Sequence, residues 1–114
     1  MLYRYVRFYY HCDIPYNANI QDVYFAHNGL GIVVNPNSKI FSGTFIQHGV
    51  TIGEENGLSP IIGHNCFIGA RAIIIGGISI GDNVRIGAGA VVVSDIPDNS
   101  TAVGVPARII KVQN

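Results

Sequence analysis

Histidines and nearby carboxylates are the residues of this chain whose types and spacing suit acid–base chemistry. His27 stands in the turn-prone stretch His27-Asn28-Gly29, where a regular pattern of aliphatic residues is interrupted. A histidine on a loop of a rigid scaffold can act as a general base near neutral pH. Asp13 and Asp22 are the candidates to hold its second ring nitrogen. On spacing alone, a surface histidine without a catalytic role is the alternative interpretation.

Two further histidines follow aliphatic residues of the same pattern. His48 comes shortly after Ile46, and we interpret it as lining a site or a subunit contact. His64 comes after Ile62 and Gly63, where we expect an exposed turn. His27 and His48 are therefore the histidines that we carry forward as site candidates.

A six-residue repeat must position these side chains. Large aliphatic residues recur six apart, and glycine follows four of them directly. This spacing matches neither the 3.6-residue helical period nor the two-residue strand period. It indicates short strands joined by corners, with one inward side chain per repeat, as in parallel β-helices. An antiparallel sandwich of short strands is the alternative. The repeat residues are Ile62, Ile68, Ile74, Ile80, Ile86 and Val92.

Three such strands make one triangular coil of eighteen residues, so residues eighteen apart stack. We expect Ile62 under Ile80, Ile68 under Ile86, and Ile74 under Val92. The same phase runs upstream to Val34, with interruptions between residues 20 and 34 and between residues 52 and 62. Insertions in solenoids form loops, which often carry the binding face. The whole chain predicts about five coils, standing about 24 Å tall at the usual strand spacing.

The 114 residues suit one domain with three segments. Residues 1–12 carry five aromatics and are expected to cap the open end of the prism. Residues 13–96 are expected to form the β-helix. Residues 97–114 depart from the period and are expected to fold back as a C-terminal tail, in which Arg108 and Lys111 add positive charge where a phosphate could be met.

Composition excludes several classes of function. Seven basic and seven acidic residues leave no basic footprint for nucleic acid. No apolar run is long enough to span a membrane, and the start does not read as a signal peptide. The two cysteines suit neither a disulfide framework nor a metal site. We therefore expect that the protein binds no metal and is located in the reducing cytoplasm. Charged residues make up only 12% of the chain, which predicts a flank hidden in an oligomer.

Several stretches together resemble the serine acetyltransferase branch of the hexapeptide-repeat acyltransferases. They are His27 with NGLGIVV, QHGVTIG at 47–53, IGARAIIIGGISIGDNVRIGAGAVV at 68–92 and GVPARII at 104–110. The resemblance covers residues 13–110. It implies an all-β, left-handed parallel β-helix that assembles as a homotrimer, with active sites between neighbouring prisms. It also implies transfer of an acetyl group from acetyl-CoA to a hydroxyl group, without a metal.

The resemblance also assigns roles to single residues. His27 matches the catalytic base, and Asp13 matches its carboxylate partner. The acceptor side would be formed by Ala26, Asn28, His48 and Ser59. The positions that would contact acetyl-CoA are Ala70, Gly76, Arg85, Ala88, Pro106 and Arg108.

Departures from the family pattern bear on the acceptor. Serine acetyltransferases carry an aspartate where this chain has Ala26, and an Arg-His pair where it has Leu58-Ser59. These side chains would bind the ammonium and carboxylate groups of an amino acid. Without them, the amino acid loses charge-assisted hydrogen bonds worth about 1.5–3 kcal/mol each. We therefore predict an O-acetyltransferase acting on a saccharide, as in the short relatives from polysaccharide biosynthesis. The alternatives are serine O-acetylation, N-acetylation of an amino sugar, and a non-catalytic trimeric scaffold.

Overall fold

Each six-residue repeat forms a short strand followed by a turn. This computed structural model describes Ile14 and residues 19–113, and the expected cap at residues 1–12 lies outside that part of the chain. Within it, β-strands dominate, and a single short 3-10 helix, η1 (Ala26–Gly29), interrupts them. The strands are β1 (Asn19–Ile20), β2 (Tyr24–Phe25), β3 (Val33–Val34), β4 (Lys39–Ile40), β5 (Phe45–Ile46), β6 (Thr51–Gly53), β7 (Ile61–Ile62), β8 (Phe67–Ile68), β9 (Ile73–Ile75), β10 (Ser79–Ile80), β11 (Arg85–Ile86), β12 (Val91–Val92), β13 (Ser100–Val103) and β14 (Arg108–Val112).

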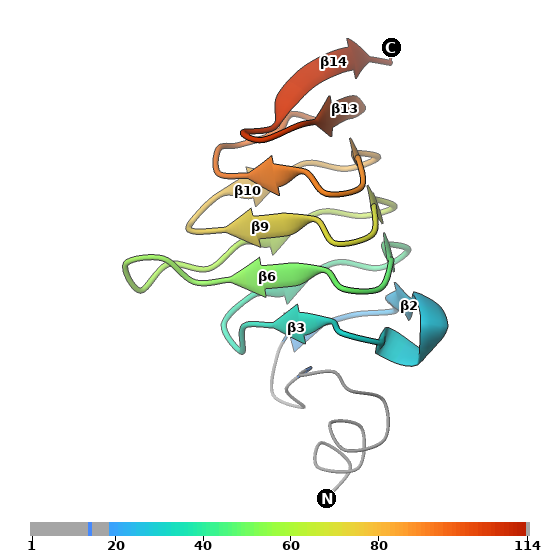
Figure 1. The fold of residues 1–114 in the computed structure, drawn as a ribbon, viewed down its shortest axis with the longest axis vertical. Coiled ribbons are helices and arrows are strands. Elements are labelled where there is room, and N and C mark those ends of the chain that lie inside the picture. Colours follow the sequence, from blue (N-terminus) through green and yellow to red (C-terminus); the bar gives the residue numbers. More distant parts are fainter. Residues whose placement is uncertain (1–13, 15–18, 114) are drawn as a thin grey trace, which may run out of the picture.

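Three sheets form the sides of a triangular prism (Figure 1). Sheet 1 has the order β1-β4-β7-β10, sheet 2 has the order β14-β13-β11-β8-β5-β2, and sheet 3 has the order β12-β9-β6-β3. Consecutive strands up to β13 belong to different sheets, so parallel neighbours within a sheet come from different coils. All of these pairings are parallel except β13 with β14.

The predicted stacking of the repeat residues is confirmed. Ile62 pairs with Ile80, Ile68 with Ile86, and Ile74 with Val92. These six side chains are at most 1% exposed and fill the prism interior. The stacked ladders are the hydrophobic core, which no coil can bury without its neighbours.

The coil is left-handed, as the resemblance implied. In Figure 1 the chain climbs from bottom to top, and the near strands β3, β6 and β9 all point to the left. A chain that runs leftwards on its near side while it climbs winds in the left-handed sense. This hand is opposite to that of ordinary parallel crossovers.

Both predicted interruptions are loops. The first contains η1, between β2 and β3. The second lies between β6 and β7, and it protrudes from the prism (Figure 1). It forms a tight hairpin, in which Glu55 and Leu58 exchange backbone hydrogen bonds of 2.9 and 3.0 Å. Asn56 and Gly57 at its tip have φ values of 53° and 78°, the left-handed conformation that Asn-Gly turns favour.

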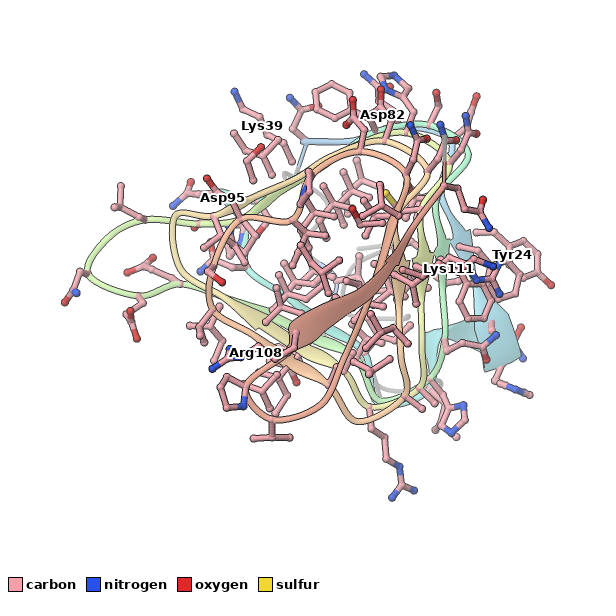
Figure 2. The ribbon with its side chains drawn as sticks, turned by 90° about the horizontal axis from the view of Figure 1, so that it is seen from above. Tyr24, Lys39, Asp82, Asp95, Arg108 and Lys111 are labelled. Atoms are coloured by element: carbon pink, nitrogen blue, oxygen red, sulfur yellow. The ribbon has the colours of Figure 1, made fainter. Side chains whose placement is uncertain are left out.

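The predicted tail contains one more strand of the parallel stack. Strand β13 pairs in parallel with β11, with Ala102 beside Ile86. The fold-back starts after β13, where residues 104–107 turn and β14 returns antiparallel to β13. Seen from above, β14 crosses the end of the prism (Figure 2). The described residues contain no helix that is both long and apolar enough to cross a membrane.

Side chains tie successive coils together at the corner between sheets 1 and 2. The backbone N–H of His64 donates to Asp82 Oδ1 at 2.8 Å, and the N–H of Asp82 donates to Asp98 Oδ1 at 2.7 Å. The His64 ring also stacks on Phe41, with centroids 5.0 Å apart. Only glycine suits position 63, because a β-carbon there would lie 2.6 Å from the Gly81 carbonyl oxygen. His64 is exposed, as expected, and its contacts are those of a structural corner residue.

Candidate functional site

The corner between sheets 2 and 3 brings several predicted site residues together, and we call it the histidine corner. It comprises residues 26–32, 47–50, 69–72 and 87–90. The Arg71 N–H donates to the His48 carbonyl at 2.9 Å, and the Gly89 N–H donates to the Ala70 carbonyl at 2.8 Å. Consecutive coils are therefore in register along this edge, about 4.8 Å apart.

His27 lies within η1, where the chain leaves the regular coil. Its φ and ψ of 52° and 39°, and those of Asn28 at 57° and 27°, are left-handed. This conformation is uncommon for residues other than glycine, and Asn and His are among those that adopt it most. Both side chains are exposed, whereas Ala26 is only 5% exposed. The loop thus presents His27 to solvent and buries Ala26 beneath it.

His48 lies beside His27 in the next coil. The two ring centroids are 5.1 Å apart, and the planes meet at 80°. His48 is half-buried, and within the described part of the chain its Nδ1 is buried without a hydrogen-bond partner. The two rings therefore pack edge to face at this corner. A neutral imidazole at this corner is suited to remove a proton from a hydroxyl.

The carboxylate partner of His27 stays a prediction. Asp13 lies outside the described residues. Asp22 lies at the corner between sheets 1 and 2, where its carbonyl accepts a bond of 2.8 Å from the Gly43 N–H. Among the residues described, no acid forms an ion pair or hydrogen bond with His27.

A pocket of about 320 Å³ lies next to the histidine corner, on sheet 2. Three of the residues expected to contact acetyl-CoA line it, namely Ala70, Arg85 and Ala88. Sequence reasoning missed the other lining residues. Most of them directly precede or follow an inward residue of the repeat, so the six-residue period could have pointed to them. The missed residues are Gln47, Phe67, Gly69, Ile86, Gly87 and Thr101.

Three further cofactor candidates lie elsewhere. Gly76 is at the corner between sheets 3 and 1, where a β-carbon would be 3.7 Å from Glu55 Cβ. It therefore packs under the hairpin, away from the pocket. Pro106 is exposed in the turn before β14. Arg108 begins β14, and its guanidinium donates to the Ala107 carbonyl at 3.3 Å.

Ser59 is also at the corner between sheets 3 and 1, at the base of the hairpin. Its hydroxyl donates to Asn35 Oδ1 at 2.8 Å, and the Asn35 amide donates to Glu54 Oε1 at 3.5 Å. Within one chain, the structure therefore does not bring Ser59 to His27. The described residues contain no group of three His, Cys, Asp or Glu side chains placed to hold a metal ion.

Comparison with known proteins agrees with this geometry. The sequence profile described as "Hexapeptide repeat of succinyl-transferase" matches residues 61–94. A serine acetyltransferase from Helicobacter pylori is 40% identical over 102 residues, which cover 86% of this chain and 60% of the relative. The crystal structure of Neisseria gonorrhoeae serine acetyltransferase matches with a TM-score of 0.91 and 36% identity, over 99% of this chain and 46% of that one. The chain belongs to the hexapeptide-repeat acyltransferases, in their serine acetyltransferase-like branch.

The predicted family and its left-handed β-helix are thereby confirmed. A serine acetyltransferase solved in complex with CoA matches this chain with a TM-score of 0.88 and 37% identity, over 96% of this chain and 46% of that one. The chain spans about half the length of the relatives and structures that it matches.

Proposed function

We propose that this chain transfers an acetyl group from acetyl-CoA to a hydroxyl group at the histidine corner. The observation that carries the proposal is the position of exposed His27 on the same prism edge as Ala70 and Ala88, which line the pocket. Relatives named serine acetyltransferase, one of them solved with CoA, support acetyl-CoA as the donor.

His27 is the general base of this proposal. As a neutral imidazole it takes the proton of the acceptor hydroxyl, whose oxygen attacks the thioester carbonyl. The tetrahedral intermediate collapses, the carbon–sulfur bond breaks, and the acetyl group stays on the acceptor oxygen. The imidazolium then returns its proton to the CoA thiolate. This step is a direct transfer, and Cys66, which is 2% exposed inside the prism, is not placed to carry the acetyl group.

L-Serine is the acceptor that the relatives favour, in contrast to the saccharide predicted from sequence. A saccharide hydroxyl remains the second candidate because of three side chains. Ala26 is buried and uncharged, Leu58 is 61% exposed, and the hydroxyl of Ser59 is bonded to Asn35. None of them supplies a charge for an ammonium or a carboxylate group.

A homotrimer is the assembly that we propose. The low share of charged residues, 12%, supports a covered flank. Exposed large hydrophobic side chains such as Tyr24 at 61% and Val33 at 41% lie on sheets 2 and 3, which meet at the histidine corner. The free Cys66 thiol supports activity in a reducing compartment, for which we propose the cytoplasm.

The test is CoA release from acetyl-CoA with L-serine and with a panel of sugars as acceptors. We expect His27→Ala to lower kcat about 10²- to 10⁴-fold, the usual share of general-base catalysis. His64→Ala is the matched control, because His64 is an exposed histidine at another corner. Equal activity of His27→Ala and the wild type would refute the base assignment. Failure of the wild type to bind acetyl-CoA would favour the scaffold alternative.

A further inference from the structure

One position of the histidine corner carries an arginine where the neighbouring coils carry glycine. The equivalent residues of four successive coils are Gly31, Gly49, Arg71 and Gly89. The backbone N–H of each of the last three donates to the carbonyl of the residue just before the equivalent position in the coil below, at 2.8 to 2.9 Å. All four residues have φ values between 61° and 71°, the left-handed conformation that favours glycine.

Arg71 is an unusual residue for this conformation. Among the described residues, every other non-glycine residue with a positive φ is an asparagine or a histidine. Asparagine and histidine adopt the left-handed conformation more readily than other side chains, and arginine has no such tendency. A side chain that is kept in an unfavourable backbone conformation motivates a search for its function.

The Arg71 side chain turns toward the coil that contains His48. A β-carbon at Gly49 would lie 2.9 Å from Arg71 Cγ, so the arginine stem lies over Gly49, one coil below its own. His48 directly precedes Gly49, and its ring packs on that of His27 at 5.1 Å between centroids. The stem therefore extends from the third coil of this edge toward the pair of histidines.

The charge of Arg71 is not matched within the chain. Arg71 is exposed, and it is the only residue of the histidine corner with a permanent charge. Within the part of the chain that the structure describes, its guanidinium has no ion-pair or hydrogen-bond partner. Arg71 is also not among the residues that line the pocket on sheet 2, where three of the donor candidates lie. Its guanidinium is therefore available to an anion that is not the donor.

We propose that Arg71 binds a carboxylate group of the acceptor. This inference rests on the proposed function and narrows its acceptor to a hydroxyl compound with a carboxylate, such as L-serine or a sugar acid. The planar guanidinium binds a carboxylate by two parallel hydrogen bonds, while His27 takes the proton of the hydroxyl. Leu58 and Ser59 offer no positive charge at their corner, and Arg71 supplies one from a different coil.

Steady-state kinetics with paired acceptors tests this assignment. L-Serine is compared with L-serinamide, and glucuronic acid with glucose, because the second member of each pair lacks the carboxylate. We expect Arg71→Gly to raise KM for the acid about tenfold or more, as for loss of a charge-assisted hydrogen bond. The KM values for acetyl-CoA and for the acceptor without a carboxylate should stay within about twofold of the wild type. Arg71→Lys should restore part of the affinity, since it keeps the charge but not the planar fork.

The variant and its control separate binding from folding. Glycine occupies the equivalent position in the other three coils, so the urea midpoint of Arg71→Gly should stay close to that of the wild type. Lys39→Met is the matched control, because Lys39 is an exposed lysine of sheet 1, the side of the prism opposite the histidine corner (Figure 2). Its KM values should equal those of the wild type.

The outcomes distinguish the two sources of the carboxylate and the two proposals. Arg71-dependent turnover of L-serine or of glucuronic acid would identify the amino acid or the sugar acid. An unchanged KM for the acid in Arg71→Gly, or an equal rise for both members of a pair, would overturn the role of Arg71. A rise in the KM for acetyl-CoA alone would also overturn it, since Arg71 would then bind the donor.

Calorimetry with the same two acids gives a readout that does not need turnover. Binding by the wild type should weaken about tenfold in Arg71→Gly. Binding of neither acid, or turnover of only the acceptors without a carboxylate, would overturn this inference and leave the proposed function standing. Absence of acetyl-CoA binding to the wild type would overturn both.

Discussion

Replacing Ile62 with alanine tests the central structural idea of one inward side chain per repeat. Ile62 is fully buried, and its strand lies between those of Ile40 and Ile80 in sheet 1. The coils above and below are fixed by backbone bonds, from the Gly63 N–H to the Ile80 carbonyl at 2.8 Å and from the Phe41 N–H to the Ile62 carbonyl at 3.0 Å. The cavity therefore cannot collapse easily, and we expect a loss of about 3–4 kcal/mol in the free energy of unfolding.

The neighbouring Ile61 provides a matched control. It belongs to the same strand, β7, but points outward and is 40% exposed. Ile61→Ala removes the same atoms, mostly from surface that already meets water, so we expect a loss of less than about 1 kcal/mol. The contrast between the two variants depends only on the side of the strand from which the atoms are removed.

Urea denaturation followed by circular dichroism measures both losses. All proteins should be compared at one protein concentration, because association contributes to apparent stability. The expected loss for Ile62→Ala is a large part of the roughly 5–15 kcal/mol that usually stabilises a domain. Losses of equal size for the two variants would refute the assignment of inward and outward positions.

Three further predictions concern single side chains. Burial raises the pKa of the Cys66 thiol, so a thiol reagent at pH 8 should modify Cys66 only in denaturant. Peptide mapping distinguishes Cys66 from Cys12, and rapid modification of Cys66 in the folded protein would contradict this prediction. The backbone hydrogen bond from His64 holds the pKa of Asp82 below its ordinary value, so Asp82→Asn should lower the urea midpoint at pH 7. The difference in midpoint from the wild type should shrink as the pH falls below about 4, where the carboxylate becomes protonated. A difference that is independent of pH would contradict this prediction. A β-carbon at Gly77 would lie 2.7 Å from Leu58 Cβ, so Gly77→Ala should displace the hairpin and change the amide NMR shifts of residues 54–59; unchanged shifts would count against this packing.

Most of the core was predictable from the sequence, because position within a coil depends only on counting. Ile62 and Ile80 are eighteen residues apart in an uninterrupted phase, so their stacking follows from the repeat. Ile40 and Ile62 also stack although they are 22 residues apart, because the hairpin adds four residues outside the coil. The period located both insertions but did not show which corner each one occupies.

The candidate site was predictable only in part. Residue types and the family resemblance identified His27, His48, Ala70, Arg85 and Ala88, which the structure places at or beside one corner. Other candidates separated. Gly76 and Ser59 lie at a different corner, because membership of a corner depends on the three-sheet order and not on distance along the chain.

The sequence by itself determined the β-helix, the inward ladders and the position of both loops, since each follows from a local six-residue rule. Only the tertiary structure decided that Arg85, Thr101 and Lys111 share one row across sheet 2. Two departures of the chain from the six-residue repeat create that row. The coil that ends in β13 is two residues shorter, with Ala102 sixteen residues after Ile86, and β14 returns antiparallel. A periodic pattern contains no information about a strand that reverses direction, so this pairing arises from packing at the end of the prism.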